Sequence, residues 1–250
     1  GRPDAEFRPG QWESIEGLLA RRRLLVVERT GWGKSMVYFL GTRLLRDQGK
    51  GPTLLVSPLL SLMRNQILAA RRIGVIAETI NSSNTDDWEA IETRLLANKV
   101  DILLISPERL ANDDFRDRIL QQVANRVGLF VVDEAHCISE WGHDFRPDYH
   151  RIWSECPEIA GLQVCAFTAT ATPAVQNDIK TQLQRPAMPS VVAGFRPPGL
   201  SFQVISCRSK SAKHAILERL LATPLPSLIY ASTRKEAESV ASAFGLRYYH

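Results

Sequence analysis

The chain has 250 residues, of which 44% are hydrophobic and 23% charged, so it can form a buried core and is not a disordered segment. Its 31 Lys and Arg residues exceed its 27 Asp and Glu residues, and the net charge of +4 is compatible with a polyanionic partner without requiring one. The four cysteines form no C-x-x-C pair, which excludes a zinc finger and a dense disulfide framework.

Short apolar runs alternate with helix-like segments through most of the chain. The runs that we expect to be strands are residues 24–27, 52–57, 74–79, 100–106, 128–132 and 162–167. The segments that we expect to be helices are residues 34–46, 60–72, 88–97 and 114–124. Nearly continuous apolar strands separated by helices predict an α/β domain with a parallel sheet and helices on both faces.

Four prolines punctuate the stretch after this alternation and predict a linker over residues 186–200. We therefore expect a first domain over residues 1–185 and the start of a second, incomplete domain over 201–250. The second domain is expected to contain strands at 202–206 and 227–230 and helices at 212–222 and 235–244.

A glycine-containing loop joins the first predicted strand to the next helix. Its sequence over residues 28–35 is Glu-Arg-Thr-Gly-Trp-Gly-Lys-Ser. Gly31 and Gly33 allow successive backbone N–H groups to point at phosphate oxygens, Lys34 supplies a positive charge, and the Ser35 hydroxyl is a candidate magnesium ligand. Glu28 occupies the position of the usual first glycine of such a phosphate loop, and we expect its side chain to turn away from the phosphates. An ordinary turn before a helix is the alternative.

Two adjacent acidic residues follow the apolar strand at 128–132. Asp133 is a candidate magnesium ligand, Glu134 can accept a proton from an attacking water, and His136 can couple that water to its neighbours. Acids at a strand end are by themselves more often a solvated turn. Combined with the phosphate loop, they predict an enzyme that hydrolyses a nucleoside triphosphate.

Several segments in order resemble the RecQ family of superfamily-2 DNA helicases. The longest match is residues 137–149, Cys-Ile-Ser-Glu-Trp-Gly-His-Asp-Phe-Arg-Pro-Asp-Tyr. The others are residues 7–11, 30–35, 106–110, 133–136, 166–171, 195–197 and 230–234. The resemblance implies a RecA-like P-loop domain, with part of a second, that uses ATP and Mg²⁺ and binds single-stranded and partly duplex DNA. We expect such a protein to be intracellular, in the cytoplasm or nucleoid if bacterial, with no membrane partner.

The resemblance also implies roles for residues around the nucleotide. Arg8 and Gln11 are expected to recognise adenine, although Gln11 also fits an exposed helix start. The loop residues Thr30 and Trp32 are expected to line the phosphates. Thr168 and Thr170 resemble the family's sensor of nucleotide state.

A further set of residues resembles the family's DNA contacts and the coupling between DNA and ATP. Trp141, His143, Phe145 and Arg146 lie in the aromatic-rich loop, where rings can stack on bases. Core packing of these rings is the alternative. Ser57 and Arg64 resemble a DNA-backbone contact, although a strand-to-helix turn with a solvated arginine fits equally well.

The leading hypothesis is an ATP-dependent DNA helicase core that moves 3′ to 5′. Because the family's second-domain arginines belong to motifs beyond His250, we expect this chain to bind nucleotide, hydrolyse it poorly and unwind little. The alternatives are an ATP-gated DNA-binding module without productive turnover and an RNA helicase.

Overall fold

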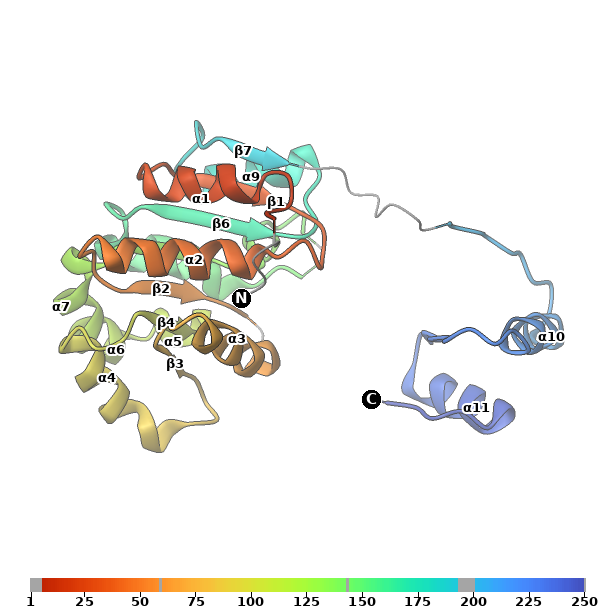
Figure 1. Ribbon diagram of the computed structural model, residues 1–250. Coiled ribbons are helices and arrows are strands. Elements are labelled where there is room, and N and C mark those ends of the chain that lie inside the picture. Colours follow the sequence, from red (N-terminus) through yellow and green to blue (C-terminus); the bar gives the residue numbers. More distant parts are fainter. Residues whose placement is uncertain (1–5, 59, 143, 193–200, 250) are drawn as a thin grey trace. The chain divides into compact units, whose positions relative to one another are not determined.

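The computed structural model describes residues 6–58, 60–142, 144–192 and 201–249, except for the side chains of 60–62 and 155. The chain divides into two compact units, residues 1–198 and 199–250. Nearly all of the described strands and helices belong to the first unit (Figure 1).

The first unit is built on a seven-stranded sheet in which every neighbouring pair is parallel. The strand order is β3-β4-β2-β5-β6-β1-β7. The strands are β1 (Leu24–Val27), β2 (Thr53–Val56), β3 (Ala77–Ile80), β4 (Ile102–Ile105), β5 (Leu129–Val132), β6 (Val164–Thr168) and β7 (Ser190–Val192). The central strands are apolar and buried along their whole length, because helices cover both faces.

Two separate hydrophobic clusters mark the two faces of the sheet. One contains side chains of α1 (Gln11–Leu19), α2 (Lys34–Asp47) and α3 (Leu60–Arg72). The other contains side chains from most of the helices that follow β3 in the first unit. The helices after β3 in that unit are η1 (Thr85–Asp87), α4 (Trp88–Leu96), α5 (Pro107–Leu110), α6 (Asp113–Phe115), η2 (Arg116–Leu120), α7 (Gln121–Val123), η3 (Ala124–Arg126), η4 (Ala135–Ile138), α8 (Pro147–Glu155), η5 (Pro157–Ile159) and α9 (Pro173–Gln182). The predicted parallel sheet with helices on both faces is confirmed.

The predicted start of the linker is wrong. β7 lies at residues 190–192, inside the segment expected to be a linker, and pairs with β1 as the edge strand of the sheet. The prolines at 186 and 189 stand immediately before this strand, where a missing N–H interrupts no ladder. The first domain therefore extends past residue 185.

The second unit contains α10 (Lys210–Leu221) and α11 (Arg234–Phe244), close to the two predicted helices. The predicted strands at 202–206 and 227–230 are wrong, because neither segment joins a ladder among the described residues. A strand needs a hydrogen-bonded neighbour and a buried face, and both segments are largely exposed.

Because the strands are parallel, the segments that follow them meet at one edge of the sheet. The loop after β1, the acidic residues after β5 and the threonine at the end of β6 are brought together there, since β6 lies between β1 and β5. Ser57 after β2 lies beside them, on the far side of β5.

Candidate active site

The loop over residues 30–35 has the backbone conformation of a phosphate cradle. Gly31 and Gly33 have φ angles of 79° and 103°, a region that residues with a Cβ avoid. Helix α2 begins at Lys34, so its free N–H groups and positive dipole end face the loop. The Lys34 ammonium group donates to the Glu28 carbonyl oxygen at 2.8 Å. Burial lowers the pKa of Lys34, while Glu134, Asp133 and Glu28 raise it in opposition.

Residues upstream of α1 brace this loop. The Gln11 side-chain amide donates to the Trp32 carbonyl oxygen at 2.8 Å and accepts from the Arg8 backbone N–H at 2.8 Å. The Arg8 guanidinium donates to the Gly31 carbonyl. Trp32 is buried, and its indole N–H donates to the Pro9 carbonyl at 3.1 Å. Gln11 is only 8% exposed, and both ends of its side-chain amide are used in bracing the loop. The buried Trp32 side chain anchors the same loop.

The carboxylate of Glu28 is buried beside Gly10. One of its oxygens is 3.9 Å from the position that a Cβ on Gly10 would occupy. The side chain therefore extends toward the start of α1.

Replacing Gly33 with alanine is expected to disturb the loop more than replacing Gly31. Both changes place a Cβ at positive φ, which costs about 1–3 kcal/mol. Only the Cβ at Gly33 would also lie 2.7 Å from the Gln11 amide nitrogen, whereas the Cβ at Gly31 meets nothing within 4 Å. Thermal unfolding of the two variants checks this. An equal loss of stability in both would contradict the bracing role of Gln11.

Asp133 is buried at the end of β5 and is held from several sides. Its Oδ2 accepts hydrogen bonds from the Gln66 amide at 2.9 Å and the Tyr38 hydroxyl at 3.4 Å, and its backbone carbonyl accepts from the Tyr149 hydroxyl at 2.9 Å. Burial first, and then Asp133, raise the pKa of the Tyr38 hydroxyl while Ser35 lowers it, so both predicted magnesium ligands act on this hydroxyl. Burial first, and then Glu134, raise the pKa of Asp133 to about 6.

Glu134 and His136 form a chain of polar contacts that leads to β6. Glu134 has a left-handed backbone, with φ 48° and ψ 47°, a strained conformation that is common at functional sites. The His136 Nδ1 atom is 3.3 Å from a Glu134 carboxylate oxygen and 2.9 Å from the Thr168 hydroxyl. The Thr168 hydroxyl in turn lies 3.4 Å from the backbone nitrogen of Thr170. The carboxylate after β5 is therefore linked through one imidazole to the end of β6.

The aromatic-rich loop packs against the backbone of this acidic segment. The Arg146 backbone N–H donates to the Cys137 carbonyl at 2.9 Å. A Cβ on Gly142 would lie 2.3 Å from the His136 carbonyl oxygen, so only glycine fits there. Trp141 is 79% exposed, which excludes core packing for this ring. Phe145 is 38% exposed and packs edge-on against His150. His143 lies outside the described residues.

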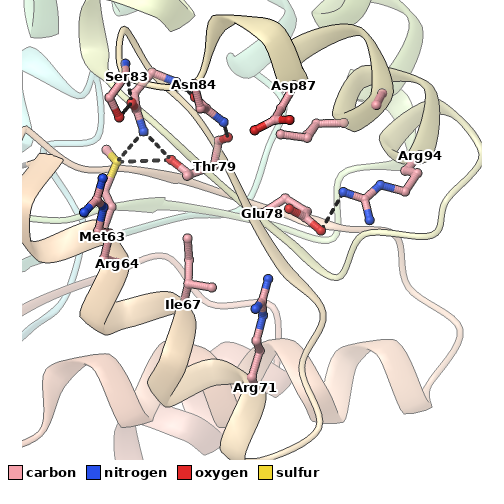
Figure 2. Close-up of a pocket in the computed structure, with 13 residues that line it drawn as sticks. Met63, Arg64, Ile67, Arg71, Glu78, Thr79, Ser83, Asn84, Asp87 and Arg94 are labelled. Carbon is pink, nitrogen blue, oxygen red and sulfur yellow. Dashed lines mark hydrogen bonds and ion pairs between the residues drawn. The ribbon is translucent and has the colours of Figure 1, made fainter.

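Two hollows lie near the predicted DNA-contact residues. Arg64 lines a cavity of about 630 Å³ with Arg71 and Arg94, and Figure 2 shows Arg94 turned toward Glu78 at 2.7 Å. Arg64 and Arg71 form no ion pair with any described residue. A second cavity of about 470 Å³ is lined by Pro58, Trp88, Ser106, Arg109 and Arg146, among others. Ser57 is buried at the carboxyl edge of the sheet, and its hydroxyl has no hydrogen-bond partner among the described side chains and backbone.

Three residues of the site were not predicted from the sequence. Tyr38, Gln66 and Tyr149 hold Asp133, and they come from α2, α3 and α8. Each lies on the buried or half-buried side of its helix, where its position indicated only core packing. Their spacing contains no signal for this role, because the contact depends on how the helices pack.

Known proteins resemble the chain over this whole site. The pattern of the DEAD/DEAH box helicase family matches residues 8–179. The ATP-dependent DNA helicase RecQ of Bacillus subtilis is 37% identical over 242 residues, which are 94% of this chain and 39% of the relative. The ATP-dependent DNA helicase Q-like 2 of Arabidopsis thaliana is 33% identical over 98% of this chain and 36% of its own length. The chain thus spans less than two fifths of these relatives. The RecQ resemblance indicated by the motifs is confirmed.

A solved structure agrees on the fold. The helicase domain of Hef from Pyrococcus furiosus superposes with a TM-score of 0.56 at 20% identity, over 74% of this chain and 37% of that one. Among the residues that the structure describes, no helix has the length and apolar character needed to cross a membrane.

Proposed function

Because the chain belongs to the DEAD/DEAH box helicase family, we propose that it is the ATP-binding core of a RecQ-type DNA helicase, in which ATP hydrolysis drives 3′ to 5′ movement on single-stranded DNA. The observation that best supports this proposal is that the phosphate loop, the acidic residues and the aromatic-rich loop lie together. The Lys34 charge interacts with Asp133 and Glu134, Glu134 lies 3.3 Å from His136, and Gly142 of the aromatic-rich loop packs on the His136 carbonyl. This arrangement joins a hydrolytic site to exposed rings that suit base stacking.

The residues present fit ATP with Mg²⁺. The positive φ angles of Gly31 and Gly33 turn the loop's backbone into a cradle, and Lys34 supplies the cation that phosphate oxygens need. Ser35 and Asp133 offer the oxygen donors that Mg²⁺ prefers and converge on one hydroxyl. Bound Mg²⁺ would neutralise phosphate charge. Arg8 lies at the loop's rim and is our candidate for contact with the adenine, with Gln11 behind it.

In hydrolysis, Glu134 accepts the proton of the attacking water. The His136 imidazole, held between Glu134 and the Thr168 hydroxyl, fixes the direction of that carboxylate. Thr168 and Thr170 make this orientation sensitive to movement at the end of β6, which is the basis of their proposed sensing role. Lys34 stabilises charge on the outer phosphates.

Contact with DNA is proposed along the carboxyl edge of the sheet and the flank of its edge strand β3. Arg64 and Arg71 have no carboxylate partner among the described residues and line one hollow, so they are available to phosphates. Arg146 lines the second hollow and donates to the Pro58 carbonyl at 3.2 Å. Ser57 lies just before that proline and supports the same edge.

The test is steady-state ATPase activity of the chain, alone and with single-stranded DNA or RNA of equal length. We expect stimulation by DNA, and its loss in Lys34→Ala. Stimulation by RNA alone would favour an RNA helicase. An ATP-gated DNA-binding module would instead bind single-stranded DNA with an affinity that changes with bound ATP, while turnover stays the same with and without DNA.

Replacing Trp141 or Phe145 with alanine is expected to weaken stimulation by DNA about tenfold or more, because each ring contributes about 1–3 kcal/mol of base stacking. Basal turnover should stay within about twofold, since neither ring belongs to the proposed catalytic set of Lys34, Asp133 and Glu134. ATPase titrations with single-stranded DNA measure both quantities. Full stimulation in both variants would disprove the coupling role of the loop.

A further inference from the structure

Three side chains of different chemistry meet between η4 and the aromatic-rich loop. The Cys137 Sγ atom is 3.7 Å from the His136 Nε2 atom and 3.7 Å from an Asp144 carboxylate oxygen. All three donor atoms lie within 4.8 Å of one another. The hydrolysis proposed above involves the Nδ1 atom on the other side of the His136 ring. Neither Cys137 nor Asp144 has a role in it.

These separations match a tetrahedral zinc site. Zn–S bonds of about 2.3 Å and Zn–N or Zn–O bonds of about 2.0–2.2 Å place the sulfur about 3.5 Å from each other donor. The sulfur is therefore within a few tenths of an ångström of the distance it needs from each partner. The His136 nitrogen and the Asp144 oxygen lie within 4.8 Å of each other and would close to about 3.4 Å around a shared ion. A thiol, an imidazole and a carboxylate together suit zinc and similar borderline-soft divalent cations better than Mg²⁺.

The imidazole is already oriented as a zinc ligand requires. A metal-bound histidine usually donates its other ring N–H to a carboxylate, which fixes the tautomer and turns the lone pair of the remaining nitrogen toward the metal. His136 has this partner, because Nδ1 is 3.3 Å from Glu134. With the proton on Nδ1, the Nε2 lone pair faces Cys137.

We propose that His136, Cys137 and Asp144 form an inhibitory site for a zinc-class divalent cation. Asp144 is 46% exposed and gives access from solvent, with water as the fourth ligand. The ion would take the carboxylate oxygen that now accepts from Arg146 at 3.3 Å. It would also tie the aromatic-rich loop to η4. The inhibitory role rests on the proposed function; the binding site does not.

The test is titration of the 250-residue chain with Co²⁺, followed by displacement with Zn²⁺, in excess Mg²⁺. We expect one equivalent to bind, with the absorption of a thiolate–cobalt bond. Cys137→Ser should abolish this absorption, and Asp144→Asn should weaken binding by at least roughly tenfold. Cys207→Ser is the matched control, because Cys207 is the exposed cysteine of the second unit, and it should bind as the parent does.

Absorption that survives Cys137→Ser, or that disappears with Cys207→Ser, would overturn the site. Unchanged Co²⁺ affinity in Asp144→Asn would also overturn the site. This position is half-exposed, so the replacement leaves the core intact. Circular dichroism of each variant checks that it is folded. DNA-stimulated ATPase activity is then measured with Zn²⁺, where inhibition in the parent should exceed that in Asp144→Asn. Equal inhibition of both, beside intact cobalt spectra, would refute the inhibitory role alone.

Discussion

Replacing Glu134 with glutamine is expected to lower the rate of ATP hydrolysis by roughly 10²- to 10⁴-fold, the usual contribution of a general base. The amide keeps the size of the side chain but cannot take a proton from water. His136 should still contact it, since a glutamine oxygen accepts from Nδ1 as a carboxylate does. Nucleotide binding should survive, because Lys34 and the loop are unchanged.

Single-turnover hydrolysis and binding of a fluorescent ATP analogue measure the two quantities separately. Thr168→Val is the matched control for the contact between His136 and β6, since it removes the hydroxyl that lies 2.9 Å from His136 Nδ1 and 3.4 Å from the Thr170 backbone nitrogen but leaves Glu134 in place. A smaller loss of rate than in Glu134→Gln is expected from it. Hydrolysis in Glu134→Gln within about tenfold of the parent would show that another group is the base.

Replacing Asp133 with asparagine is expected to remove hydrolysis and yet stabilise the metal-free chain at pH 8, by about 2 kcal/mol. The shift of the Asp133 pKa from 3.8 to about 6 corresponds to about 3 kcal/mol. Roughly 1 kcal/mol is subtracted for a poorer hydrogen bond to Gln66 or the Glu134 backbone. In our proposal the charge of this carboxylate, which destabilises the metal-free chain, serves to hold Mg²⁺.

The sign of the pH dependence follows from the raised pKa. Relative to the unfolded chain, the folded chain favours the protonated carboxyl group. The protonated Asp133 carboxyl group therefore contributes fully to the stability of the folded chain below the unfolded pKa near 3.8. This contribution is lost as the pH rises through the folded pKa of about 6. The advantage of Asp133→Asn should therefore be largest at pH 8 and fade below pH 5. Urea unfolding of both proteins in EDTA at several pH values measures it, and a constant difference would contradict the raised pKa.

Much of the site could be predicted from short sequence patterns, because it uses backbone conformation and strand ends. Gly31, Gly33 and Lys34 indicate a phosphate loop wherever a strand precedes and a helix follows. Asp133 and Glu134 end a buried strand, and parallel strands bring their carboxyl ends to one edge. The roles of these residues stay predictions, although the structure brings them together.

Contacts between helices could not be predicted in this way. Gln66 lies on α3 and Tyr149 on α8, and only the packing of these helices on opposite faces of the sheet brings both to Asp133. Trp32 was expected to line the phosphates, but its side chain is buried and donates to the Pro9 carbonyl, so it anchors the loop. Exposure also decided between two interpretations of Trp141.

The sequence by itself determined the family and the parallel α/β fold and predicted the phosphate loop, because periodicity and backbone-restricted motifs are local properties of the chain. Only the tertiary structure decided that β7 extends the sheet, that 202–206 and 227–230 form no ladder among the described residues, and that Cys137 meets Asp144. The reason is physical. A strand ladder, a buried carboxylate or a three-ligand cluster forms only when segments that are distant in sequence come into contact. Local sequence patterns carry no information about which distant segments will meet.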